Sequence, residues 1–119
     1  SNSDIISFHC KTTKDGKPLI TKEHYKKMKP TAYIINAARG NMVDEKDLND
    51  ALNENLIAGA ALDVYSKEPA KENILFKNSK VILTPHIAAS TTEASIVVAE
   101  MVANQISDFL LKGNKVNTV

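Results

Sequence analysis

The chain has 119 residues, which suffices for one domain with a sizeable core. Its 15 basic and 14 acidic residues nearly cancel, and no stretch approaches the roughly 18 apolar residues that a membrane span needs, so neither nucleic acid nor a membrane is an expected partner. Cys10 is its single cysteine, which excludes a disulfide framework and a multi-thiol metal site and agrees with a reducing compartment, the cytoplasm.

The first third of the chain predicts a strand, a loop and a helix. Residues 4–9 are typical of a short strand. After a polar loop, Thr21 is expected to cap a helix that holds Lys26 and Lys27 in its last turn and that ends before Pro30.

The middle of the chain predicts two more strands with a helix between them. Residues 32–38 form an apolar strand that leads to Arg39, and Asp44 is expected to cap the following helix. The apolar residues of this helix recur at helical spacing, and they are Leu48, Ala51 and Leu52. Small residues open a third strand over 58–63, and residues 66–79 form an irregular connection.

The last strand and helix are strongly apolar. Residues 81–84 are typical of a buried parallel strand, and they lead directly into Pro85 and His86. Residues 91–112 carry the longest helical pattern of the chain, which Gly113 ends. Because this helix is more apolar than a surface helix requires, we expect it to cover a second domain or another subunit as well.

The alternation of strands with helices predicts an α/β fold in which parallel strands are joined by right-handed crossovers. This order corresponds to half of a doubly wound parallel sheet, followed by a long C-terminal helix. Open sheets of this kind bind their ligands at the carboxyl ends of the strands.

Four chemically useful side chains follow the predicted strand ends. An imidazole such as His86 both donates and accepts a proton near neutral pH, and Glu68 can hold its far ring nitrogen. Arg39 offers a planar fork that matches a carboxylate, and Asp63 can accept a hydrogen bond from a carboxamide. A hydroxyl-to-carbonyl redox reaction needs a proton donor and acceptor near the oxygen, a cation for the anionic group of the substrate, and a group that holds the nicotinamide.

Each of these residues also has a purely structural explanation, which is the better one when the residue is taken singly. A histidine after a strand is more often a satisfied structural residue, and Arg39 or Asp63 can simply cap or turn the chain. Glu68 before Pro69 can be merely solvated, and His9 is expected to be structural rather than to line the site. Because all four residues share a placement at strand ends, one catalytic site and four separate structural roles are about equally well supported by the spacing.

The same residues lie in motifs that resemble the signatures of the D-isomer-specific 2-hydroxyacid dehydrogenases, in order and in spacing. The motifs cover nearly the whole chain, and they are Met28–Gly40, Ala58–Val64, Glu68-Pro69 and Thr84–Thr91. Within the family, the run Pro85–Ala94 is most similar to the D-3-phosphoglycerate dehydrogenases. The resemblance implies the carboxyl-side half of a Rossmann-like NAD-binding domain.

The resemblance also implies a role for each site residue, and no metal. Arg39 is implied to bind the substrate carboxylate, with Glu68 as the partner acid and His86 as the catalytic acid and base. Asp63 is implied to hold the nicotinamide carboxamide. The residues expected around the NAD cofactor are Ala37, Ala38, Arg39, Asp63, His86, Ala88 and Ala89.

Two positions and one motif depart from the family pattern. Thr31 stands where the family usually has glycine, and Lys11 stands where a proline often touches the cofactor. No two of the four glycines can form G-x-G-x-x-G, the loop that supports a dinucleotide pyrophosphate. We therefore expect residues 1–112 to be the second half of an NAD-binding domain, and residues 113–119 to start the return toward an absent substrate domain.

Two classes of function stay open at this point. The first is part of an NAD-dependent oxidoreductase, inactive alone, that interconverts a D-2-hydroxy acid and its 2-keto acid. The preferred substrate is 3-phosphoglycerate, in serine biosynthesis, with glyoxylate or hydroxypyruvate as the alternative. The second class is a non-enzymatic interaction module, like the C-terminal-binding-protein corepressors, which share the fold and the catalytic residues. In either class, unpaired strand edges favour a homodimer.

We expect the chain alone to bind NAD weakly or not detectably, because the nicotinamide end offers few strong anchors without a pyrophosphate-binding loop. Isothermal titration calorimetry with NAD measures this affinity directly. A dissociation constant in the micromolar range would contradict the expectation.

Overall fold

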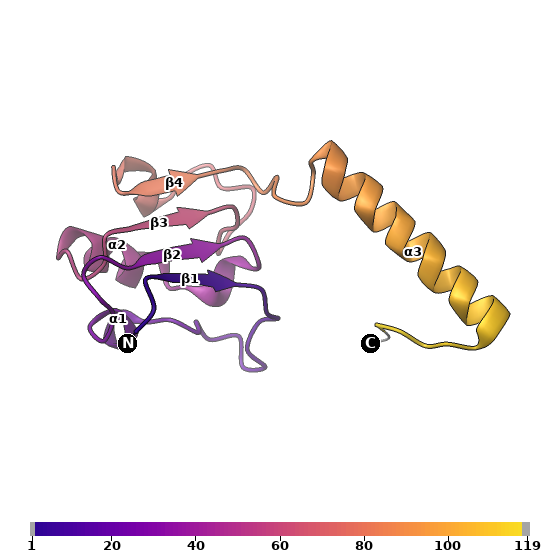
Figure 1. Ribbon diagram of the computed structural model, residues 1–119. Coiled ribbons are helices and arrows are strands. Elements are labelled where there is room, and N and C mark those ends of the chain that lie inside the picture. Colours follow the sequence, from indigo (N-terminus) through magenta and orange to yellow (C-terminus); the bar gives the residue numbers. More distant parts are fainter. Residues whose placement is uncertain (1, 118–119) are drawn as a thin grey trace. The chain divides into compact units, whose positions relative to one another are not determined.

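A computed structural model of the chain describes residues 2–117, which divide into two compact units after His86 (Figure 1). The first unit contains a parallel sheet with its helices, and the second contains one long helix. Thr118 and Val119, the end of the predicted return segment 113–119, lie outside the described residues.

The first unit is organised around four parallel strands, which lie side by side in Figure 1 in the order β1-β2-β3-β4. They are β1 (Ile5–Phe8), β2 (Tyr33–Asn36), β3 (Gly59–Leu62) and β4 (Val81–Leu83). Because the strands are parallel, their carboxyl ends share one edge of the sheet. The predicted α/β architecture is confirmed.

The helices of the first unit are α1 (Lys22–Tyr25) and α2 (Glu45–Asn53), and two 3-10 turns are η1 (Gly40–Met42) and η2 (Ile74–Lys77). The predicted cap of α2 is present, since the Asp44 carboxylate accepts a hydrogen bond of 2.9 Å from the Asp47 backbone N–H.

Helix α1 is shorter than the sequence predicts. It ends at Tyr25, so Lys26 is its C-cap rather than part of the last turn, and Lys27 lies beyond it. The N–H groups of Lys27 and Met28 donate to carbonyls three residues earlier, which tightens the chain into turns there.

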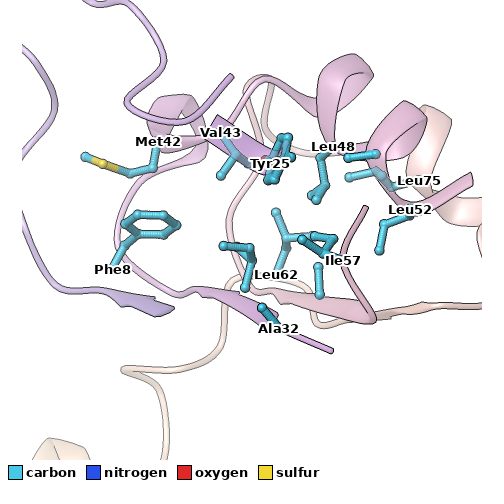
Figure 2. Close-up of a cluster of buried hydrophobic side chains, with 13 residues drawn as sticks. Phe8, Tyr25, Ala32, Met42, Val43, Leu48, Leu52, Ile57, Leu62 and Leu75 are labelled. Atoms are coloured by element: carbon cyan, nitrogen blue, oxygen red, sulfur yellow. The ribbon is translucent and has the colours of Figure 1, made fainter. Parts of the chain in front are cut away.

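The hydrophobic core lies between the sheet and α1, α2 and η2 (Figure 2). Alternate strand residues, such as Ile34 and Leu62, point into it, and the predicted apolar face of α2 completes it. Complete burial of a large aliphatic side chain contributes about 2 kcal/mol to stability. The fully buried members on the helices and turns include Tyr25, Leu48, Leu52 and Leu75.

The opposite face of the sheet is apolar and exposed within the first unit. It presents Ile5, Tyr33, Ile35 and Ile82, of which Ile82 is 71% exposed. The prediction that residues 81–84 form a buried strand is therefore wrong for this unit. Strand β4 has one strand neighbour, and only its face with Val81 and Leu83 packs against the core, so Ile82 on the other face is exposed.

The second unit contains α3 (Thr92–Lys112), which ends at the predicted residue and begins one residue later than predicted, because Thr91 is its N-cap. The Thr91 hydroxyl accepts a hydrogen bond of 3.1 Å from the Ala94 N–H, and Gly113 ends the helix in a left-handed conformation that glycine adopts without strain. No residue of α3 is buried within the second unit, so that unit by itself leaves the broad apolar surface of the helix uncovered.

Helix α3 is also long and apolar enough to cross a membrane, by length and composition alone. This corrects the expectation of no span-like segment. Between Ala94 and Leu111 the helix carries only two ionisable residues, Glu100 and Asp108, which interrupt the apolar run without making the segment polar. Core helices of soluble proteins satisfy the same criterion.

Replacing Gly40 with alanine should destabilise the first unit by about 3 kcal/mol, because the new methyl group would clash with the backbone of Tyr65, which cannot move aside as a side chain can. The added Cβ would lie 1.7 Å from the backbone carbonyl oxygen of Tyr65. Gly16→Ala is the matched control, with no atom within 4 Å of the new Cβ, and should cost about 1 kcal/mol because of its positive φ. Urea unfolding measures both, and equal losses would contradict the prediction.

Candidate active site

The predicted site residues of the first unit lie along the carboxyl edge of the sheet. Arg39 follows β2, Asp63 and Glu68 follow β3, and His86 follows β4. Parallel strand direction places these loops at the same edge, where open α/β sheets bind ligands.

The side chains of His86 and Glu68 are in direct contact. The His86 Nδ1 lies 2.6 Å from the Glu68 Oε2, a distance typical of a charge-assisted hydrogen bond in which the ring N–H donates to the carboxylate. This contact fixes the ring orientation and leaves Nε2 as the nitrogen for proton transfer. The pairing therefore has the geometry that an acid–base histidine requires.

Glu68 is held by a second hydrogen bond as well. Its Oε1 accepts from the backbone N–H of Tyr65 at 2.9 Å. The hydrogen bond from His86, followed by the one from Tyr65, lowers the pKa of the Glu68 carboxyl below its ordinary value. Glu68 is thus an ionised partner for the imidazole at neutral pH.

The backbone of His86 is in a left-handed conformation, with φ +57°, which a residue other than glycine seldom adopts. Thr84, between β4 and His86, is held by hydrogen bonds to two residues that follow β3. The hydroxyl of Tyr65 donates to the Thr84 carbonyl at 2.8 Å, and the Thr84 hydroxyl donates to the Asp63 carboxylate at 2.5 Å. The hydrogen bonds around His86 are consistent with strain retained at a functional residue.

Tyr65 and Thr84 were not predicted as site residues. Their only signal in the sequence is their place near Asp63 and His86, since Tyr65 directly follows the motif Ala58–Val64 and Thr84 begins the motif Thr84–Thr91. Burial, followed by the nearby Asp63, raises the pKa of Tyr65, so its hydroxyl keeps the proton that it donates.

Asp63 is nearly buried, with 6% of its surface exposed, at the carboxyl end of β3. It directly follows the last residue of β3, and its carboxylate accepts the short hydrogen bond from Thr84. Its binding of a carboxamide stays a prediction.

Arg39 is exposed, and a buried asparagine fixes the loop that carries it. The Asn36 amide is fully buried, donates to the Arg39 carbonyl at 2.9 Å and accepts from the Ala38 N–H at 3.2 Å. Arg39 itself donates from Nη1 to the Ala38 carbonyl at 2.7 Å. Asn36 was missed by the sequence reasoning, although one polar residue in the apolar run Tyr-Ile-Ile-Asn-Ala is a usable signal.

The carboxyl edge of the sheet contains two separate hollows. The histidine hollow, of about 640 Å³, is lined by His86, Glu68, Tyr65 and Phe76 among others, and the last two rings pack edge to face with centroids 6.1 Å apart. The arginine hollow, of about 540 Å³, is lined by residues 8–12 and 37–39. The expectation that Arg39 shares one space with His86 and Glu68 is therefore not met within the first unit, because Arg39 opens toward the β1 loop.

The remaining predicted residues have mixed outcomes. Ala37 and Ala38 line the arginine hollow, and so does His9, which was expected to be structural instead. Ala88 and Ala89 belong to the second unit and are exposed ahead of α3. Among residues 2–117, no group of three or more His, Cys, Asp or Glu side chains is suited to a metal ion.

Comparison with known families gives a match over residues 1–88, to the family described as D-isomer specific 2-hydroxyacid dehydrogenase, NAD binding domain. A D-3-phosphoglycerate dehydrogenase of Synechocystis sp. is 50% identical over 111 residues, which are 93% of this chain and 20% of that protein. A glyoxylate reductase of Thermofilum pendens is also 50% identical, over 87% of this chain and 31% of that protein. The chain thus spans between a fifth and a third of the length of these curated relatives.

Solved structures show the same fold. A glyoxylate reductase from Paecilomyes thermophila superposes with a TM-score of 0.78 and 33% identity, covering 98% of this chain and 35% of that one. An acyclic imino acid reductase in complex with NADPH and D-Arg superposes with a TM-score of 0.80 and 34% identity, covering 98% of this chain and 37% of that one.

Glu68 should make the stability of the first unit depend on pH in the acid range. Because its folded-state pKa lies below the ordinary value of 4.5, its contribution is present in full above pH 4.5 and is lost as the pH falls through the lower, folded-state pKa. The difference in unfolding free energy between the wild type and Glu68→Gln should therefore shrink in acid, as urea titrations at several pH values can measure. Glu72→Gln, at an exposed glutamate of the same connection, is the control, and a matching trend in both variants would contradict the assignment.

Proposed function

Since this chain belongs to the D-isomer-specific 2-hydroxyacid dehydrogenase family, as part of its NAD-binding domain, we propose that it supplies the catalytic residues of an NAD-dependent oxidoreductase. The reaction is the interconversion of a D-2-hydroxy acid and its 2-keto acid. The observation that carries the proposal is the 2.6 Å contact between His86 and Glu68 at the carboxyl edge of the sheet.

His86 handles the proton of this reaction. As an imidazolium it donates a proton from Nε2 to the substrate oxygen during reduction of the ketone, and as a neutral ring it accepts the hydroxyl proton during oxidation. The ionised Glu68 accepts the hydrogen bond from Nδ1 and so orients the ring with Nε2 toward the substrate oxygen.

Arg39 binds the substrate carboxylate through its guanidinium fork, and this exposed side chain has to turn from the arginine hollow toward His86 to share one substrate with it. The residues around it also fit the nicotinamide half of a dinucleotide. Ala37 and Ala38 have small side chains that leave room in the arginine hollow, and the nearly buried Asp63 carboxylate is an acceptor at the neighbouring strand end. When bound, NAD supplies the hydride acceptor and, in reduced form, the hydride donor.

We propose 3-phosphoglycerate, in serine biosynthesis, as the substrate, and glyoxylate or hydroxypyruvate as the second candidate. Relatives with 50% identity carry the names D-3-phosphoglycerate dehydrogenase and glyoxylate reductase, which supports 3-phosphoglycerate and glyoxylate as the acids to test first. A cytoplasmic location follows from this metabolic role.

The chain is proposed to be the second half of a cofactor domain over residues 1–112, with 113–119 returning toward a substrate domain. Its 20% and 31% coverage of longer relatives supports this arrangement. We propose that α3 packs on protein, in a homodimer, rather than crossing a membrane. Reductases of known structure superpose on 98% of the chain, and the uncovered apolar surface of α3 needs a partner.

In the full-length polypeptide, His86→Ala should reduce kcat about a thousandfold, since general acid–base catalysis is lost, while NADH affinity is largely retained. His86→Asn is a second variant that tolerates the left-handed backbone at position 86 and should lose turnover equally. NADH oxidation with phosphohydroxypyruvate, glyoxylate and hydroxypyruvate measures activity and separates the two substrate candidates.

His24→Ala, at an exposed histidine of α1, is the matched control and should keep full activity. Full turnover in His86→Asn would overturn the assignment of the acid. A wild-type enzyme that turns over none of the three acids would instead favour the interaction module.

A further inference from the structure

The arginine hollow carries an unbalanced positive charge. Its lining contains two cations, Lys11 from the loop after β1 and Arg39 from the loop after β2, and no aspartate or glutamate. Among the described residues, neither cation forms a salt bridge with an acidic side chain. A hollow with one sign of charge attracts a ligand group of the opposite sign.

The two walls of this hollow are joined to each other. The Cys10 sulfur lies 3.8 Å from the Met42 sulfur, and the Met42 N–H donates to the Arg39 carbonyl at 3.1 Å. The buried Asn36 amide holds the Arg39 side of the hollow from below. The backbone of this site is therefore largely formed before a ligand arrives, which lowers the entropic cost of binding.

The two cations differ in the anion that they suit. The guanidinium fork of Arg39 matches the two oxygens of one carboxylate, and this is its role in the proposed function. Lys11 adds a compact point charge, which suits a phosphate group. A substrate carboxylate bound by Arg39 leaves the Lys11 charge without a partner. The two cations together therefore fit a carboxylate and, in addition, a phosphate group.

We propose that Lys11 makes the arginine hollow a phosphate-binding site. The ligand is a phosphate group of either the dinucleotide or a phosphorylated hydroxy acid, and these two sources rest on the proposed function. Lys11 is a specificity-determining residue that discriminates ligands by phosphate and takes no part in proton transfer.

The first test is a titration of the chain with inorganic phosphate at constant ionic strength, followed by the ¹H–¹⁵N signals of Thr12 and Ala38. Phosphate should shift both signals, and Lys11→Gln should weaken the affinity about fivefold. Lys14→Gln removes an exposed lysine of the same loop that does not line the hollow, and should bind like the wild type. Absence of shifts, or equal weakening in both variants, overturns the proposal.

The second test compares KM values in the full-length enzyme. If the phosphate belongs to the substrate, Lys11→Gln raises KM for phosphohydroxypyruvate and leaves KM for glyoxylate unchanged. If it belongs to the cofactor, the variant raises KM for NADH or NADPH with either acid. Unchanged KM values for all four ligands overturn the site, whereas a wild-type enzyme without any dehydrogenase activity overturns the proposed function and leaves the phosphate titration as the independent measurement.

Discussion

The parallel pairing of the four strands is the constraint on which the candidate site depends. In-register pairs such as Tyr33 with Gly59 and Ala60 with Val81 align the strands, so that each carboxyl end opens on the same edge. Residues separated by more than twenty positions, such as Arg39 and Asp63, thereby enter one region of the surface. Antiparallel pairing of any strand would send its loop to the opposite edge.

Tyr65 connects the loops at that edge. Its N–H donates to Glu68, its hydroxyl donates to the Thr84 carbonyl, and its own carbonyl lies against the Cα side of Gly40. Each such hydrogen bond adds about 1 kcal/mol in net stability, but its larger effect is geometric. Three loops that carry the arginine, the carboxylate and the imidazole are positioned against one buried side chain and its backbone.

Features governed by local chemistry were predictable from the sequence. The Asp44 cap, the helix end at Gly113 and the contact of Glu68 with His86 were all predicted, because each has a short-range signal or lies in a recognisable motif. The orientation of Arg39 toward the β1 loop was not.

The differences arise where packing decides. The length of α1 depends on turns that follow Tyr25, and the exposure of Ile82 depends on which elements cover the sheet. Asn36 acts through backbone groups of a loop whose shape no propensity specifies. Such properties depend on the assembled structure rather than on residue pattern.

The uncovered sheet face has a practical meaning for protein engineering. Ile5 on β1, Tyr33 and Ile35 on β2 and Ile82 on β4 form an apolar platform on this face, to which β3, between β2 and β4, contributes only the small Gly59 and Ala61. All-parallel sheets are normally covered on both faces. A designer who wants a free-standing version of this chain should therefore graft one amphipathic helix onto that platform, and can leave every loop of the catalytic edge untouched.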